Sequence, residues 1–158
     1  MRSGKVIKRL IKPDPIYHSV LVAKLINKVM VSGKKTIATT LVYKALENIK
    51  QQSKSEPLAI LEKAMENITP KMEVRPRRVG GASYQVPMEV RGERKETLAI
   101  RWLILAARGK SNKEFHSFDQ KLAVEIMDGA NQAGGAFKKK EDMQKVANAN
   151  RAFAHFRW

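Results

Sequence analysis

The sequence predicts a mainly α-helical protein, a six-helix bundle with a protruding two-stranded antiparallel β-hairpin arm. Apolar residues recur at helical spacing through most of the chain. Between residues 72 and 91 the spacing changes to a period of two, on either side of Gly80-Gly81. A chain of 158 residues can bury about 70% of its unfolded surface, which is enough for one core. We therefore expect a single domain over residues 1–158, with a basic extended arm (1–18), the hairpin (72–91) and a basic-aromatic tail (151–158).

The N-terminal arm is basic and has few apolar residues. It ends in Pro13-Asp14-Pro15, and two prolines so close together exclude a helix there. We expect the arm to extend from the bundle rather than to pack in its core. Its basic side chains are Arg2, Lys5, Lys8, Arg9 and Lys12.

Three helices are expected before the hairpin. Residues 19–31 are apolar on nearly all sides, which predicts a buried helix that Gly33 stops. Residues 36–52 form an amphipathic pattern. The third helix opens with Ser55 as its expected N-cap and a proline in its first turn, and it ends at Pro70. The apolar face of the second helix is Ile37, Leu41, Val42, Ala45, Leu46 and Ile49.

The hairpin is the most distinctive segment of the sequence. Met72 and Val74 alternate with charged residues, and strict alternation predicts one apolar and one charged face for the ribbon. Pro76 and Pro87 cannot donate to a strand ladder, which suits a ribbon with open edges. Seven Lys or Arg residues against three Glu between positions 71 and 95 favour a surface that grips phosphates over a merely solvated one. The apolar residues of the second strand are Tyr84, Val86, Met88 and Val90.

Three more helices are expected after the hairpin. In residues 93–108, which Gly109 ends, Arg94, Arg101 and Arg108 recur every seven residues and form one stripe. The stripe can dock along a phosphate backbone, or its arginines can pair with nearby glutamates; the sequence leaves both interpretations open. A fifth helix covers residues 117–132 and is broken by the glycines at 134–135, and the last helix begins near Lys138.

Composition indicates a polyanionic partner. The chain has 31 Lys and Arg against 15 Asp and Glu, a net charge of +16, and nucleic acid relieves such self-repulsion. The longest apolar run, residues 98–107, is interrupted by Arg101, so we expect no membrane span. The N-terminus lacks the apolar region of a secretory signal, so we expect no secretory signal. The absence of cysteine excludes disulfides and thiolate metal sites.

Catalytic motifs are missing. Residues 33–36 resemble the end of a phosphate-binding loop, but the required earlier glycine is replaced by Lys28, and Lys35 stands where a Ser or Thr must follow the first lysine. The histidines at 18, 116 and 155 have no spacing typical of metal ligands. A nuclease that uses His116 or His155 would lack a paired base or metal cluster. We therefore expect no enzymatic activity, no metal and no cofactor.

Several motifs, in order along nearly the whole chain, resemble the ribosomal protein seven family of the small subunit. Residues 110–119 depart from the family pattern, because this loop is slightly longer and more aromatic. The matching segments are residues 13–15, 25–26, 33–35, 41–47, 73–87, 101–102, 106–108, 135–142 and 152–158.

This resemblance implies a helical bundle with a protruding β-ribbon that binds the three-prime major domain of small-subunit ribosomal RNA and nucleates assembly of the subunit head. It also implies a position near the exit site, where transfer RNA and messenger RNA pass, beside small-subunit ribosomal proteins nine and eleven. The implied ribosomal RNA contacts are Lys8, Arg9, Lys12, Lys34, Lys35, Arg75, Arg77, Arg78, Arg91, Arg94, Arg101, Arg108, Lys138, Lys139 and Lys140. The implied contacts on the messenger and transfer RNA side are Arg78, Gly80, Gly81, Tyr84, Arg151, His155, Arg157 and Trp158.

Two interpretations compete with parts of this assignment. Lys138, Lys139 and Lys140 can be only a solvated helix start, although positive charge there opposes the helix dipole and favours a nearby anion. A DNA-architectural protein would also combine a helical body with a basic β-arm, but it would require a continuous duplex rather than a structured RNA junction. An organellar origin of the gene is also open.

Overall fold

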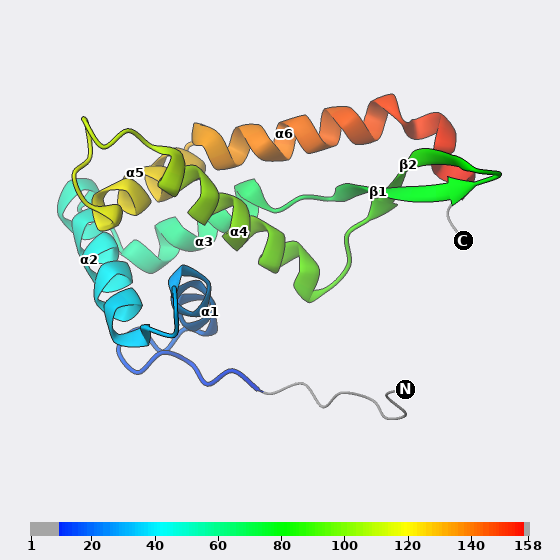
Figure 1. The fold of residues 1–158 in the computed structure, drawn as a ribbon. Helices are drawn as coiled ribbons and strands as arrows, with labels where there is room; N and C mark the ends of the chain where they lie inside the picture. The colour runs from blue at the N-terminus through cyan, green and yellow to red at the C-terminus, as the bar shows by residue number, and fades with distance from the viewer. Residues whose placement is uncertain (1–9, 157–158) are drawn as a thin grey trace.

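The computed structural model describes residues 10–156, and within them the predicted fold class is confirmed: six α-helices, a short terminal 3-10 helix (η1) and one antiparallel β-ribbon (Figure 1). The ribbon projects from the end of the bundle, between the third and fourth helices in the chain. The elements are α1 (Val20–Val29), α2 (Lys35–Ser53), α3 (Pro57–Ile68), β1 (Met72–Val79), β2 (Ala82–Glu89), α4 (Glu93–Gly109), α5 (Phe118–Ala130), α6 (Gly134–Ala149) and η1 (Arg151–Phe156).

The core is organised around α5, which packs against α2, α3, α4 and α6. Leu122 and Ile126 on this helix are completely buried. Gly129 allows α3 to come close, because a Cβ atom there would lie 2.8 Å from Cδ1 of Ile68. Ile37 was expected on the buried face of α2 but is 54% exposed. Ile37 lies in the first turn of α2, where the neighbouring Ala38 takes the buried position instead.

Several helix boundaries differ from the predictions, and α1, for example, ends at Val29 rather than at residue 31. Glu56, not Ser55, precedes α3, and the Ser55 hydroxyl donates to the carbonyl of Ser53 instead of capping the helix. Helix α5 ends at Ala130, before residue 132. Helix α6 begins at Gly134 rather than near Lys138, so the glycines open this helix and do not merely separate it from α5.

The pairing of the two strands overturns the prediction of one apolar and one charged face. A two-residue turn at Gly80-Gly81, both at positive φ, places Arg77 opposite Tyr84 and Arg75 opposite Val86. Opposite residues share a face, and every pair joins an odd-numbered residue to an even-numbered one. The even-numbered apolar residues of β2 therefore share a face with the odd-numbered charged residues of β1. Both faces of the ribbon are mixed.

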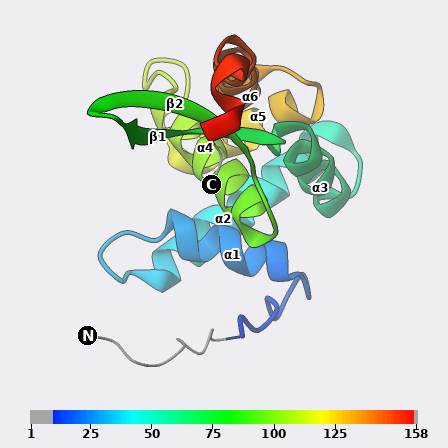
Figure 2. The same ribbon diagram turned by 90° about the vertical axis from the view of Figure 1, so that its right-hand side faces the viewer.

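Helix α6 and η1 connect the far end of the bundle to the ribbon. Helix α6 runs from the bundle to the base of the ribbon, where it contacts β1 and β2, and η1 packs against β2 (Figures 1 and 2). Val86 and Pro87 are both buried although neighbouring strand residues point to opposite faces. The base of the ribbon is thus covered on both sides, while its tip projects.

Candidate nucleic-acid interface

A buried carboxylate joins the ribbon to α4. Glu73 of β1 accepts hydrogen bonds from Nε of Arg75 at 2.6 Å and from Nε of Arg94, on the first turn of α4, at 2.8 Å. Burial opposes ionisation of Glu73, but hydrogen bonds and charge from Arg94 and Arg75 outweigh it and hold the pKa of Glu73 below its ordinary value. The same contact raises the pKa of Arg94. A charged cluster therefore forms at the point where the ribbon leaves the bundle.

The sequence left open whether the arginine stripe of α4 docks on a phosphate backbone or pairs with glutamates, and its three arginines differ in this respect. Arg94 pairs with Glu73, yet about half of its side chain stays exposed. Arg101 is exposed, and its side chain has no hydrogen bond or ion pair with another described residue. Arg108 is exposed, and its Nη2 donates to the carbonyl of Val29 at the end of α1, at 3.4 Å. Only the first arginine of the stripe is paired with a glutamate among residues 10–156.

The other predicted basic residues spread over the surface in separate groups. Lys12, Lys34 and Lys35 are exposed at the side of the bundle formed by the N-terminal segment and the start of α2. Lys8, Arg9, Arg157 and Trp158 lie outside the described residues. The predicted basic residues that are exposed on or beside the ribbon and on α6 include Arg75, Arg78, Arg91, Lys138 and Lys139, with Arg77 partly exposed.

Lys140 has a structural role that the sequence did not reveal. Its Nζ donates to the carbonyl of Asn67 in the last turn of α3 at 2.6 Å, and it lies 5.0 Å from the centre of the Phe137 ring. It therefore ties α6 to α3. Lys138 and Lys139 remain exposed, but α6 begins four residues earlier, so these lysines are not at the positive end of the helix dipole. The dipole argument for an anion at the triplet is therefore wrong.

The C-terminal segment is folded onto the ribbon. Tyr84 of β2 lies 5.2 Å, centre to centre, from the rings of both Phe153 and Phe156 in η1. His155 contacts the Phe156 ring at 4.0 Å, and its side chain is exposed together with that of Arg151. We call Tyr84, Phe153 and Phe156 the aromatic clasp. No local pattern signals it, because Tyr84 and η1 are far apart in the sequence.

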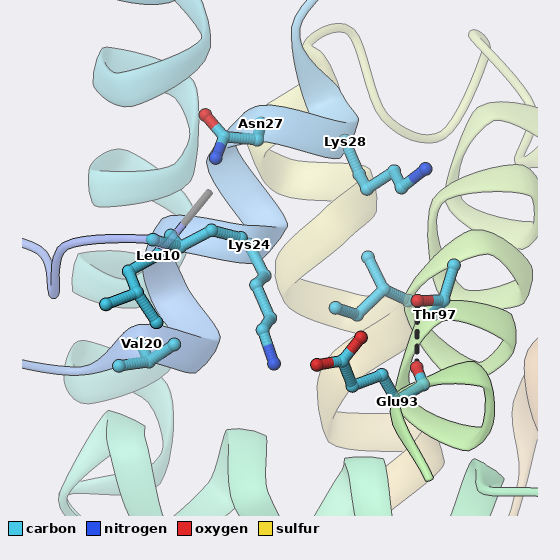
Figure 3. Close-up of a pocket in the computed structure, with 9 residues that line it drawn as sticks. Leu10, Val20, Lys24, Asn27, Lys28, Glu93 and Thr97 are labelled. Atoms are coloured by element: carbon cyan, nitrogen blue, oxygen red, sulfur yellow. Dashed lines mark hydrogen bonds between the residues drawn. The ribbon is translucent and has the colours of Figure 1, made fainter. Parts of the chain in front are cut away.

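A cleft of about 650 Å³ lies between the N-terminal segment, α1 and α4. Two of the residues that line it are lysines that the sequence pattern did not mark as candidates for binding nucleic acid. Lys24 and Lys28 extend from α1 toward α4, as Figure 3 shows. Lys24 pairs with Glu96, which links the two helices. The helical pattern of residues 19–31 suggested burial on all sides, whereas the actual helix leaves the lysine side exposed to this cleft.

Asp14 fixes the chain between the arm and α1. Its carboxylate is buried, accepts the backbone N–H groups of Ile16 and Tyr17, and accepts the Tyr43 hydroxyl at 2.8 Å. Burial, followed by the hydrogen bond and charge of Asp14, raises the pKa of Tyr43 to about 12. Lys12 is therefore held two residues from a rigid anchor.

A second buried network supports α6. Glu125 of α5 accepts the backbone N–H of Ala136 at 2.8 Å, which satisfies a donor at the start of α6. Nζ of Lys110 lies 3.0 Å from Glu125 and 2.9 Å from Asp128. Burial alone would lower the pKa of Lys110, but these two carboxylates raise it. Lys121 donates to the carbonyl of Lys110 at 2.6 Å, so the network also holds the start of the divergent 110–119 loop.

Within residues 10–156, no group of three or more His, Asp or Glu side chains is arranged to hold a metal ion. None of the described helices is long and apolar enough to cross a lipid bilayer.

Comparison with known proteins identifies the family. The profile of the family described as Ribosomal protein S7p/S5e matches residues 1–151. The small ribosomal subunit protein uS7 of Carboxydothermus hydrogenoformans is 56% identical over 157 residues, 99% of each chain. The proteins of the same name from Dictyoglomus thermophilum and Latilactobacillus sakei are 54% and 53% identical over the same length and share of each chain. The chain therefore belongs to the ribosomal protein S7p/S5e family.

Proposed function

We propose that this protein is a structural, non-enzymatic component of the small ribosomal subunit, acting in the cytoplasm as a primary binder of small-subunit ribosomal RNA. The single observation that carries the proposal is identity above 50%, over 99% of the chain, with proteins named for the small subunit. The charge and geometry agree with it, because a net charge of +16 and a projecting ribbon with basic residues at its base and tip suit an RNA surface.

The finer part of the proposal concerns which RNA and which neighbours the protein binds. We propose that it binds the three-prime major domain of the ribosomal RNA and nucleates assembly of the subunit head. Small-subunit proteins nine and eleven are the proposed neighbours. The ribbon tip and the exposed residues of η1, Arg151 and His155, would face messenger and exit-site transfer RNA. The support is the projection of the tip beyond the bundle (Figure 1) and the exposure of both side chains.

Footprinting of the purified protein on small-subunit ribosomal RNA tests the proposal. We expect protection confined to the three-prime major domain, and an affinity that falls steeply with salt because several cations replace condensed counterions. Duplex DNA of similar length serves as the control for the DNA-architectural alternative. Equal affinity for that duplex, or a flat salt response, would contradict specific ribosomal RNA binding.

A further inference from the structure

We propose that Glu73 is a positioning residue of the RNA-binding surface: it orients the guanidinium groups of Arg75 and Arg94 as a pair that receives a backbone phosphate. The inference rests on the proposed RNA-binding function and assigns a role to an acid within a basic surface. The pair lies at the base of the ribbon, where β1 meets α4.

The geometry of the hydrogen bonds leaves both arginines able to bind an anion. Arg75 presents Nε and Nη2 to Oε1 of Glu73, at 2.6 Å and 2.5 Å. Arg94 presents Nε and Nη2 to Oε2, at 2.8 Å and 2.7 Å. A guanidinium group has five N–H donors, so the edge formed by Nη1 and Nη2 remains available on each arginine. That edge matches two oxygens of a phosphate.

Exposure separates the two roles within the cluster. The Glu73 side chain is 8% exposed, whereas the side chains of Arg75 and Arg94 are 48% and 51% exposed. The carboxylate is thus buried behind the two cations, and an approaching phosphate meets the arginines first. They line a cleft of about 480 Å³ together with Arg91, Met88 and Glu89.

The charge balance supports an anionic ligand rather than a closed ion pair. Two guanidinium groups share one carboxylate, so the cluster keeps a net positive charge. In the same cleft the positive charge of Arg91 is offset by the negative charge of Glu89, so the cleft as a whole also stays positive. Holding each guanidinium in place before binding lowers the entropy that its long side chain loses when it takes a phosphate. Without Glu73 the two cations would repel each other and separate.

The substitution Glu73→Gln distinguishes a positioning role from a simple effect of charge, because the two predict opposite changes in RNA affinity. On charge alone, removing an acid from a basic surface strengthens RNA binding. If Glu73 positions the arginines, we expect binding to the isolated three-prime major RNA domain to weaken about tenfold, the loss of about 1.4 kcal/mol. The slope of log K against log salt should also become shallower by about 0.7 to 0.9 for the phosphate contact that is lost.

Glu89→Gln is the matched control. Glu89 is exposed and lines the same cleft, and its side chain has no hydrogen bond or ion pair with another described residue. We expect this variant to bind RNA as tightly as the wild type or slightly more tightly. Arg94→Lys keeps the charge but loses the planar fork, and it should reproduce the weakening seen for Glu73→Gln. Thermal unfolding of each variant establishes that it is folded at the binding temperature.

The outcomes separate the positioning role from the proposed function. The positioning role is overturned if Glu73→Gln binds as tightly as Glu89→Gln, or if Arg94→Lys binds like the wild type, while the wild type binds tightly. A wild-type protein that does not bind the RNA domain overturns both the proposed function and the positioning role. The positioning role of Glu73 is supported if Glu73→Gln and Arg94→Lys lose affinity for the RNA while Glu89→Gln does not.

Discussion

At the scale of single residues, buried acids carry much of the structural information. Asp14, Glu73 and Glu125 are each enclosed, and each accepts hydrogen bonds from another part of the chain. A carboxylate that is buried without partners is costly, so each of these contacts fixes the segment that supplies the donors. In a protein with twice as many basic as acidic residues, these acids position basic segments.

The contact between Tyr43 and Asp14 predicts that the free energy of unfolding decreases at alkaline pH. The pKa of Tyr43 rises from 10.0 in an unfolded chain to about 12 in the fold, so the stabilisation is fully present below pH 10 and is lost as pH rises through about 12. Because phenylalanine has no hydroxyl to ionise, we expect the Tyr43→Phe variant to lack this contribution to the loss of stability at high pH. Chemical denaturation at several pH values measures it, and an identical decline in both proteins would contradict the assignment.

Gly134 predicts a strong local effect at the start of α6. Its φ is +83°, and a Cβ atom would lie 2.9 Å from both Oε1 of Glu125 and Cβ of Asp128. A left-handed backbone conformation costs an L-residue about 1–2 kcal/mol, and we expect Gly134→Ala to destabilise the fold by at least this amount. Gly109→Ala is the control, because no heavy atom lies within 4 Å of its added Cβ and its φ is not positive. Equal unfolding midpoints for the two variants would refute this role of Gly134.

At the scale of elements, the sequence predicts each helix and the hairpin but not how distant elements meet. Helical spacing is local, so the bodies of α2, α4 and α5 follow from it. The mixed faces of the ribbon follow from the turn: alternation within each strand does not relate one strand to the other, whereas a two-residue turn at Gly80-Gly81 sets the pairing. The missed start of α6 depends on Glu125, a contact with another helix.

In the candidate site, too, the sequence predicts the basic residues but not the contacts that they make with distant elements. Charge and spacing placed Arg75 on a basic ribbon and Arg94 on a basic stripe, and the family resemblance implied both as RNA contacts. Their shared partner Glu73 required the three-dimensional contact between β1 and α4. The same limit applies to Lys140, which the family resemblance implies as an RNA contact: nothing in its local sequence indicates that it binds the end of α3. Residue type predicts which side chains can bind phosphate, and tertiary contacts decide which of them are free to do so.

The aromatic clasp predicts that η1 steadies the ribbon. Aromatic pairs contribute about 0.5–1.5 kcal/mol beyond the area they bury, so Tyr84→Ala should loosen both β2 and η1. Hydrogen exchange should become faster in these two elements and stay unchanged in α5. Gln85→Ala, the next residue on the opposite face, serves as the control. Tyr84→Phe should behave like the wild type, since the ring and not the hydroxyl makes the contact. Unchanged exchange in Tyr84→Ala would show that the clasp contributes nothing.

At the scale of the whole molecule, the protein has two structural regions that support one surface. The bundle has its own core around α5, and the ribbon is held by α6 and η1 on one route and by α4 on the other. The base of the ribbon is therefore rigidly connected to the bundle, while the tip around Gly80-Gly81 projects beyond it (Figure 1). In the proposed function, anchoring to ribosomal RNA therefore falls to the base of the ribbon and contact with passing RNA to its tip.

This division predicts that the ribbon can be shortened without preventing assembly. Deleting Arg78, Val79, Ala82 and Ser83 joins Arg77 and Tyr84 through the same two glycines, so the pairing of the remaining strands and the aromatic clasp are preserved. Glu73 and its two arginines stay in place as well. We expect the shortened protein to fold with nearly unchanged stability and to enter small subunits, because the contacts at the base are intact.

The ribosomes that contain the shortened protein should differ in function. If the tip faces the exit site, removing it should alter retention of exit-site transfer RNA or maintenance of the reading frame. Ribosomes carrying Gln85→Ala are the control, since that change leaves the length of the ribbon intact. A shortened protein that never enters subunits would make the tip an assembly anchor. Normal retention and normal reading frame would contradict a role of the projecting tip at the exit site, because the deleted residues are the two pairs that carry the turn beyond Arg77 and Tyr84.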